Sequence, residues 1–492
     1  MNQRQLYRIN NPCYLGQTKG DLDKDPNHTD IWYSFETEEE GNSLDDQILA
    51  EIAEKGVLQH LHKDQQQPPK TQPLAIQKLK EYTPKDRISQ VQNGSYVTNC
   101  VLKKTKFDLS LLNKEIVPED IKQMLGRNYQ KNKDGTIEMV NQEILKRQKQ
   151  VLGSLVKQFG SALFSGKSIM GISLPVAIFE PQSQLEREAF SLLFAPHYLE
   201  QAGATLDKVE QFRLAVAFLI ASLHIGTNPQ KPFNPILGET FQGIIGDSPV
   251  YAEQISHHPP VCALQLLGKN YTLDAKTEFT ASISLNSVRS AKVGYLTVTY
   301  KNTKSKIMMT YPAGLMSGTA FGRRTFQFIE KFYVFDIENK FYTEIDFDLD
   351  KNVAFKKACK GVKPTKDSFF GEIHKVSQKF ANKLKEESAK SPIPEFGFRE
   401  KDHSIEKFGT VEGSWMTDLK IAEQNYWSHG NPWPYKLRYL ENPLPSDANF
   451  RLDVLYLRAQ DEEKSQENKQ KLEEIQRADR KLREQQVMKS KK

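Results

Sequence analysis

Cysteine is scarce in this chain of 492 residues, and long apolar runs are missing. The four cysteines lie far apart and form no CxxC pair: Cys13, Cys100, Cys262 and Cys359. This spacing disfavours both a disulfide framework and a zinc site, and it fits a reducing compartment. The longest apolar run spans residues 214–223, whereas a transmembrane helix needs about 18–20 apolar residues. Because the first 16 residues also lack the apolar segment of a signal peptide, we expect a cytoplasmic protein.

Charge and hydropathy divide the chain unevenly. The formal net charge is +6, which is mild for this length and indicates tolerance of anionic surfaces rather than a dedicated nucleic-acid-binding protein. Residues 1–140 are polar and include an acidic tract at 35–40 and a Gln/Pro-rich stretch at 64–73. A segment of this composition buries too little apolar surface to offset its ordering entropy. We therefore predict that residues 1–140 are largely disordered.

An amphipathic helix is predicted at about residues 141–163. Five apolar residues fall at spacings i, i+3, i+4, i+7 and i+11, so they lie on one helix face: Leu152, Leu155, Val156, Phe159 and Leu163. An ordinary helix that packs on a core has this pattern. A mobile lid, or a helix that lies on a membrane surface, has the same pattern.

The region between residues 240 and 350 has the pattern of an antiparallel sheet. Residues 341–350 alternate between apolar and polar, 295–300 and 332–337 read as further strands, and 338–340 reads as a turn. Successive strands without helical crossovers pair antiparallel. An eight-stranded barrel leaves room for at most one small ligand, so a larger cavity requires more strands. The prediction is an α+β, mainly β fold that forms a barrel or a curled sheet.

Two further helices are predicted. Residues 206–223 read as a long apolar helix with Thr205 as its N-cap. Residues 455–489 read as a charged helix, and three of its residues are spaced i, i+4, i+8 on one face: Lys469, Glu473 and Arg477. The central carboxylate can hold both cations in place while they point towards a ligand.

Residues 253–260, EQISHHPP, place two histidines directly before two prolines. The prolines fix their own φ, and Pro259 also favours an extended conformation at His258. The chain therefore forms a stiff corner that carries two imidazoles. A metal site, a general-base site and an anion site are the three kinds of site that such a corner can make.

The residues around this corner favour an anion site. A metal needs three or four converging ligands, and Glu253 is the one further candidate nearby. Catalysis needs a nucleophile with an orienting group, but Ser256 merely adjoins His257 in sequence and the chain has no GxSxG motif. Imidazoles on a rigid corner are good ligands for a phosphate, especially beside fixed cations.

A second stretch, KPFNPILGETF at 231–241, adds groups of the same kind. Lys231 supplies a cation and Asn234 a side-chain donor. The sequence Asn-Pro makes a rigid turn, and Gly238 allows close approach of the backbone. Alone this is an ordinary turn, but together with EQISHHPP it forms a specific pair of motifs.

These motifs resemble those of the oxysterol-binding protein family. EQISHHPP resembles the EQxSHHPP fingerprint of the family, and KPFNPILGETF resembles its second motif. The resemblance extends through GISLPVAIFEPQSQLER at 171–187 and the C-terminal helix, and covers about residues 145–485. It implies a near-closed antiparallel β-barrel around a lipid tunnel, with an N-terminal amphipathic lid. It also implies binding of phosphatidylinositol 4-phosphate and of a second lipid, either a sterol or phosphatidylserine.

The resemblance assigns a role to individual residues. It implies that the phosphates of the headgroup contact His257, His258, Lys231 and Asn234. Lys469 and Arg477 are expected at the rim, with Glu473 matching the acidic position between them. The lid is expected at 141–170 and the lipid-binding domain, including the charged helix, at 171–485.

The expected activity is exchange of lipids between membranes by a non-enzymatic protein. Such a protein contacts membranes peripherally and needs neither a metal, a cofactor nor a nucleic acid. The alternative function is that of a lipid sensor or scaffold, which binds the same ligand and signals through its N-terminal region. A lipid-modifying enzyme is a third and weaker interpretation.

Overall fold

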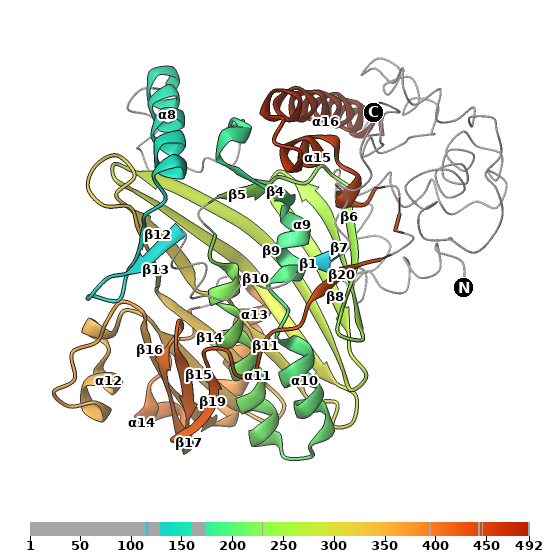
Figure 1. The fold of residues 1–492 in the computed structure, drawn as a ribbon. Helices are drawn as coiled ribbons and strands as arrows, with labels where there is room; N and C mark the ends of the chain where they lie inside the picture. The colour runs from blue at the N-terminus through green and yellow to red at the C-terminus, as the bar shows by residue number, and fades with distance from the viewer. Residues whose placement is uncertain are drawn as a thin grey trace, which may run out of the picture.

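The computed structural model describes residues 115–116, 128–159, 173–228, 230–392, 395–440, 443–444 and 446–490 (Figure 1). Most of the N-terminal region predicted to be disordered lies outside the described residues. Residues 128–139, however, form a hairpin that joins the main sheet through β3. The main sheet therefore includes residues on the N-terminal side of residue 140.

The main sheet is built from strands that come from almost the whole folded chain. Its members are β1 (Glu115–Ile116), β2 (Tyr129–Lys131), β3 (Ile137–Met139), β6 (Thr240–Ile245), β7 (Ser248–His257), β8 (Pro260–Leu267), β9 (Tyr271–Ser284), β10 (Ser287–Tyr300), β11 (Lys306–Met309), β12 (Ala313–Ser317), β13 (Thr325–Ile329), β14 (Lys331–Asp336), β15 (Phe341–Asp346), β16 (Ser368–Val376), β17 (Ser404–Ser414), β18 (Asp418–Ile421), β19 (Gln424–Ser428) and β20 (Leu437–Tyr439). A separate parallel pair consists of β4 (Phe179–Ser183) and β5 (Lys231–Phe233).

Every ladder of the main sheet is antiparallel, as predicted from the lack of helical crossovers. The order runs from β1 through β20, β6, β7, β8 and β9 to β10, which then pairs with both β11 and β12. One branch continues to β19 and the other to β2. Among the described residues no ladder joins the outer strands, so the curled sheet is not closed by hydrogen bonds. The antiparallel sheet of the predicted near-closed barrel is confirmed, and in the described residues this sheet remains open at its edges.

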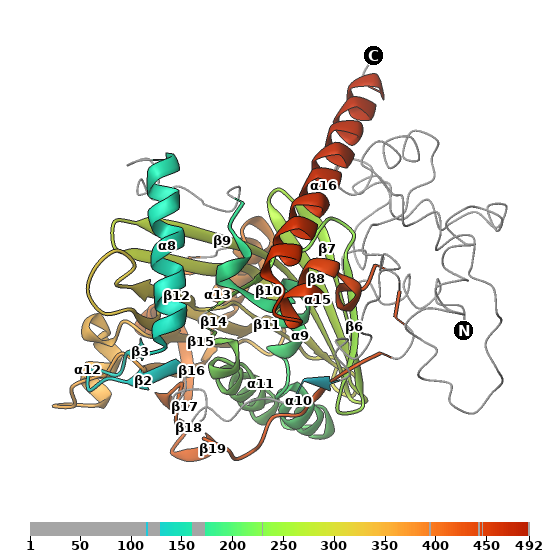
Figure 2. The ribbon, with the colours of Figure 1, turned by 45° about the horizontal axis from the view of Figure 1, so that its top comes forward.

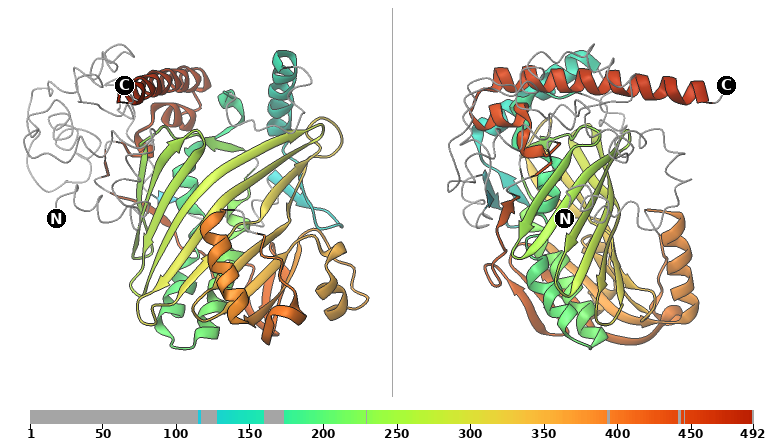
Figure 3. Two further views of the ribbon diagram at one scale, coloured as in Figure 1. Left: turned by 180° about the vertical axis from the view of Figure 1, so that it is seen from behind. Right: turned by 90° about the vertical axis from the view of Figure 1, so that its right-hand side faces the viewer.

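Helices lie on the open side of the curl, along its upper rim and against its outer face (Figures 1 and 2). They are α8 (Gln142–Phe159), α9 (Gln184–Phe190), α10 (Ala195–Ala204), α11 (Lys208–Ser222), α12 (Val353–Ala358), α13 (Gln378–Lys390), α14 (Glu400–His403), α15 (Leu452–Arg458) and α16 (Glu462–Ser490). Short 3-10 helices lie at Val176–Ile178, His224–Gly226, Leu349–Lys351 and Ala448–Phe450. Figure 3 shows that α16 crosses the rim and extends beyond the sheet.

The apolar helix predicted at 206–223 is α11, with a different start. Asp207 is its N-cap, because its carboxylate accepts from the backbone N–H groups of Val209 and Glu210. Thr205 instead ends α10, where its N–H donates to Gln201. Almost every residue of α11 from Gln211 onwards is buried, which explains its apolar character all round. No described helix is long and apolar enough to cross a membrane.

The alternating segment at 341–350 has a second buried face. Phe341 and Ile345 contact the main core, whereas Tyr342, on the opposite face, is fully buried in a separate cluster. That cluster includes Phe380 of α13 and Phe396, whose rings lie 5.2 and 5.9 Å from the Tyr342 ring. The predicted polar face is therefore covered by a helix. The strand also ends at Asp346, since a 3-10 helix follows at Leu349–Lys351.

We expect Tyr342→Ala to destabilise the protein by about 3–5 kcal/mol, because it removes a large side chain from a packed cluster. Urea unfolding measures this change. Tyr435→Ala is the matched control, since Tyr435 is 42% exposed and its loss should cost below about 1 kcal/mol. Equal and small effects of both substitutions would show that this face of β15 is not part of a core.

Candidate ligand-binding site

The two histidines lie at the β7–β8 corner, where β7 ends at His257 and β8 begins at Pro260. Their imidazole rings are 4.5 Å apart in an edge-to-face arrangement. The hydroxyl of Ser256 donates to the carbonyl of Pro259 at 2.7 Å, so the corner is fixed from within. Burial, and then the positive charge of Arg480, lower the pKa of His258. Both imidazoles line a pocket of about 250 Å³.

Lys231 and Asn234 reach the same pocket from β5 and the turn after it. The Lys231 ammonium donates to the Asn234 side-chain oxygen and lies 4.9 Å from the centre of the Phe179 ring. Burial lowers the pKa of Lys231 to about 7, with further lowering by the charges of Lys469 and Arg451. An anion in the pocket would reverse this effect by favouring the protonated ammonium.

The predicted face of the C-terminal helix also turns towards this pocket. Lys469 is 6% exposed and forms an ion pair with Glu473, which in turn lies 3.7 Å from the Arg477 guanidinium. Ser173 accepts from Lys469 at 3.0 Å and donates to Glu473. Thus Glu473 lies between the two cations, in the position that the helical spacing predicts.

All the predicted headgroup residues therefore line one pocket although they come from segments more than 200 residues apart. They are Lys231, Asn234, His257, His258, Lys469, Glu473 and Arg477. Two further cations in the lining, Arg451 and Arg480, are absent from the prediction. Extending the helical spacing of Lys469 by eleven residues would have found Arg480, because that step returns to the same face. Arg451 has no comparable signal in the sequence.

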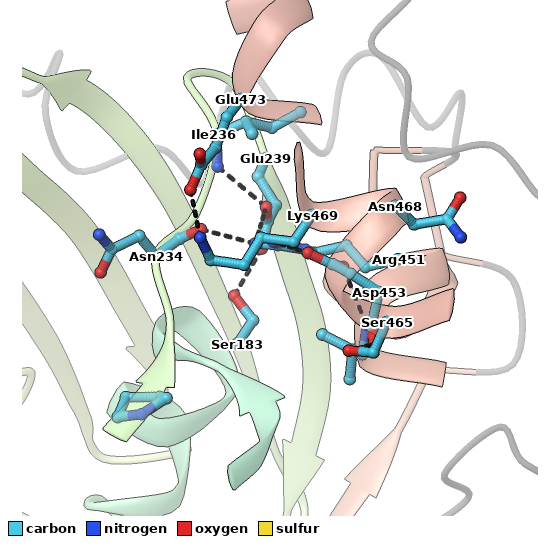
Figure 4. A network of polar contacts seen from close by, with 12 residues as sticks. Ser183, Asn234, Ile236, Glu239, Arg451, Asp453, Ser465, Asn468, Lys469 and Glu473 are labelled. Atoms are coloured by element: carbon cyan, nitrogen blue, oxygen red, sulfur yellow. Dashed lines mark hydrogen bonds and ion pairs between the residues drawn. The ribbon is translucent and has the colours of Figure 1, made fainter. Parts of the chain in front are cut away.

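Arg451 is buried beneath the pocket and connects its two halves (Figure 4). Its guanidinium donates to both carboxylate oxygens of Asp453, at 3.0 and 2.6 Å, and to Glu239 at 2.9 Å. It also donates to the backbone carbonyl of Asn234 at 2.7 Å. Burial raises the pKa of Glu239 to about 7 against the opposing charge of Arg451.

The pocket has an excess of positive charge. Its described lining holds five cationic side chains and one carboxylate: Lys231, Arg451, Lys469, Arg477, Arg480 and Glu473. Nowhere in the described ranges are three or more His, Cys, Asp or Glu side chains placed to hold a metal ion. The chemistry of the lining therefore suits a multiply charged anion rather than a cation.

A larger cavity of about 510 Å³ lies inside the curled sheet and shares part of this lining. Lys231, Asn234 and His257 line both spaces, so the charged pocket stands at one end of the larger cavity. Most of the larger lining is aliphatic or aromatic, with contributions from β9, β10, β12, β13 and α11. Such a surface favours hydrocarbon over water.

The predicted lid helix is α8, and its apolar face covers one side of the larger cavity. Leu152 and Leu155 line the cavity, as does Val151, which is absent from the predicted stripe. Val156 packs against an apolar cluster formed by Val151, Leu155 and Ile283. The side chain of Phe159 and all of Leu163 lie outside the described residues. Two polar contacts also hold α8: Arg147 donates to Glu462, and Arg324 donates to the side-chain oxygen of Gln148.

The fold and site define a class of β protein: a curled antiparallel sheet whose apolar chamber opens on a cationic pocket. The chain belongs to the oxysterol-binding protein family, because the family model described as oxysterol-binding protein matches residues 155–492. This confirms the resemblance seen in the sequence motifs.

Individual relatives agree with this assignment. Oxysterol-binding protein 9 of Dictyostelium discoideum is 29% identical over 367 residues, which cover 74% of this chain and 82% of that protein. Oxysterol-binding protein-related protein 3B of Arabidopsis thaliana is 25% identical over 322 residues, which cover 64% of this chain and 66% of that protein. The crystal structure of the Osh1 ORD domain in complex with cholesterol is 20% identical, with a TM-score of 0.51 over 68% of this chain and 80% of that one. The last similarity establishes the fold.

The lowered pKa of Lys231 predicts how anion binding depends on pH. Above pH 7 the free ammonium loses its proton, and a bound phosphate must restore it. Affinity for a soluble inositol phosphate should therefore fall as the pH rises from 7 to 9, by at most about tenfold per unit. Calorimetry in two buffers of different ionisation enthalpy measures the proton uptake.

Lys231→Arg is the control for this experiment, because a guanidinium stays protonated over the whole range. Its affinity profile should be flatter than that of the unmodified chain. Identical profiles for both proteins would mean that Lys231 does not take up the proton.

Proposed function

We propose that this protein transfers lipids between membranes, with phosphatidylinositol 4-phosphate as one of its ligands. The headgroup phosphates contact the cationic pocket, and the acyl chains occupy the apolar cavity under α8. A second lipid, either a sterol or phosphatidylserine, occupies the same cavity in exchange. The protein acts in the cytoplasm, contacts membranes peripherally and leaves the lipid chemically unchanged.

The observation that carries this proposal is the continuity of two opposite environments. Lys231, Asn234 and His257 belong to the linings of both the cationic pocket and the apolar cavity. An amphiphile with an anionic head and long hydrocarbon chains satisfies both environments at once. A soluble anion would leave the apolar cavity unfilled, and an uncharged hydrocarbon would leave the excess cations without a partner.

The apolar cavity also supports transport rather than binding alone. Burying apolar surface stabilises a lipid inside the protein by about 25 cal/mol for each Å² removed from water. A covering helix is then needed to keep water from the chains during passage between membranes. The apolar face of α8 lies in that position. A sensor or scaffold would need the headgroup pocket, but it would not need an apolar cavity covered by a helix.

Replacing His257 and His258 by alanine tests the headgroup site. Hydrogen bonds to a charged group contribute about 1.5–3 kcal/mol each, so extraction of phosphatidylinositol 4-phosphate from liposomes should fall at least about tenfold. His197→Ala is the control, since His197 lies outside the described linings of both cavities. If the double variant extracts the lipid at the rate of the unmodified protein, His257 and His258 do not bind the headgroup. Extraction without net delivery to acceptor liposomes by the unmodified protein would favour the sensor.

Two single substitutions, which each place one carboxylate on an opposite face of α8, test the lid. Leu155 is 8% exposed, so Leu155→Asp places a charge against the apolar cluster, whereas Ser154→Asp places the same charge on the exposed face. We expect Leu155→Asp to lower the transfer rate between liposomes by about tenfold or more, and Ser154→Asp to change it by less than about twofold. Co-elution of lipid in gel filtration gives a second readout. Full retention and transfer by Leu155→Asp would show that α8 is not a lid.

A further inference from the structure

The wall of the apolar cavity contains an ion pair that the headgroup site does not use. Glu188 of α9 and Lys292 of β10 both line the 510 Å³ cavity. The Lys292 ammonium lies 2.8 and 3.0 Å from the two carboxylate oxygens of Glu188. The Glu188 side chain is 6% exposed and that of Lys292 is 26% exposed. The lysine is therefore the member of the pair with more accessible surface.

Stability alone does not account for this pair. Removing two charges from water costs about as much as their attraction returns, so apolar residues of similar volume would serve as well or better in a cavity wall. The surroundings nevertheless hold the pair in one geometry. Gln184 donates to Glu188 at 2.9 Å, and the Lys292 ammonium lies 5.1 Å from the ring centre of Tyr311 and 5.8 Å from that of Phe279.

The chemistry of the pair selects one kind of ligand group. An ammonium has three donors, and the contacts with Glu188 lie on one side of it. The neighbouring carboxylate neutralises its charge, so a second anion gains little from approaching it. An uncharged acceptor oxygen can instead accept a hydrogen bond from Lys292 without disturbing the ion pair.

The strand register places this pair inside the chamber and away from the headgroup pocket. Ser256 pairs with Val261, Val261 with Glu278, and Glu278 with Val293, which follows Lys292. Lys292 is thus three strands away from the histidine corner, or about 14 Å at the usual spacing of about 4.8 Å. It also lies four residues along β10 from Val288, which contacts the apolar face of α8. That step is about 13 Å along a strand.

We propose that Glu188 and Lys292 form a polar subsite in the chamber wall, where the Lys292 ammonium donates a hydrogen bond to an uncharged oxygen of the bound lipid. This inference rests on the proposed function, because it assumes that a lipid occupies the chamber. Two lipid groups have the required chemistry. One is an ester carbonyl of a glycerophospholipid, and the other is the hydroxyl of a sterol.

Ligand analogues test the subsite in the unmodified chain of 492 residues. Diester phosphatidylinositol 4-phosphate is compared with its diether analogue, which lacks the carbonyls, and cholestanol is compared with cholestane, which lacks the hydroxyl. A hydrogen bond from a charged donor predicts that the oxygen-bearing member of one pair binds about tenfold or more tightly. Competition with a fluorescent lipid measures the four affinities.

A double substitution then connects that preference to the pair. Glu188→Met with Lys292→Met removes both charges together and keeps the volume, so neither partner is left buried and uncompensated. In this variant the ligand that bears the oxygen and its analogue that lacks it should bind with about equal affinity. Lys292→Arg, which keeps a charged donor, should retain a preference.

The matched control is the exposed ion pair of Arg289, on the same strand, with Glu330. These side chains are 41% and 46% exposed, their charged atoms are 2.6 Å apart, and both residues lie outside the described linings of the two cavities. Arg289→Met with Glu330→Met should leave every ratio unchanged. Circular dichroism and the unfolding midpoint of each variant report that the fold is intact.

The outcomes distinguish a failure of the proposed subsite from a failure of the proposed function. A carbonyl-dependent or hydroxyl-dependent preference that disappears in the double methionine variant supports the subsite and identifies the group that it binds. Affinities that do not depend on either oxygen, or a preference that survives the double substitution, overturn the subsite while lipid binding stands. Failure of the unmodified chain to bind any of the four lipids overturns the proposed function itself.

Discussion

The buried guanidinium of Arg451 joins the two parts of the chain that make the ligand pocket. It donates to Asp453 on its own side and to Glu239 and the Asn234 backbone on the other. Removing a cation from such a network leaves carboxylates buried without compensation, which is costly. The network therefore holds α15, and the helix α16 that follows it, against the turn after β5. As a result, Lys469 and Lys231 approach the same Phe179 ring, at 5.7 and 4.9 Å.

The described lining of the resulting pocket holds more cationic than anionic side chains. Burial and neighbouring cations lower the pKa of Lys231, and Glu473 is the one carboxylate in the described lining of the pocket. That carboxylate is shared between Lys469 and Arg477. A phosphate that enters this space gains several charge-assisted hydrogen bonds and relieves the repulsion among the cations. The network below fixes the turn that carries Asn234 against Arg451, which reduces the ordering that this part of the pocket requires on binding.

Local patterns in the sequence predict the parts of this site that lie on one element. The helical repeat brings Lys469, Glu473 and Arg477 together, and the two proline-containing motifs mark the corners at 231–241 and 253–260. Strand direction follows from the lack of crossovers. Contacts between distant segments have no such signal: Arg451 meets residues more than 200 positions away, and Glu188 meets Lys292 across 104 positions. The burial of Tyr342 could not be predicted for a related reason. Alternation predicts that β15 has two faces, but it does not predict that α13 covers the second face.

The contacts of α8 bear on the proposal that it opens the apolar cavity at a membrane. The ion pair between Arg147 and Glu462 is about 40% exposed on both sides, and pairs of that kind contribute about 0–1 kcal/mol. Leu155 and its apolar neighbours also pack against Ile283 and Val288, and Gln148 of α8 accepts a hydrogen bond from the buried Arg324. Burial of apolar surface is not directional, so a bilayer offers those side chains an equivalent environment once α8 leaves the sheet. If α8 acts as the proposed lid, its opening would therefore cost less free energy at a membrane surface than in water.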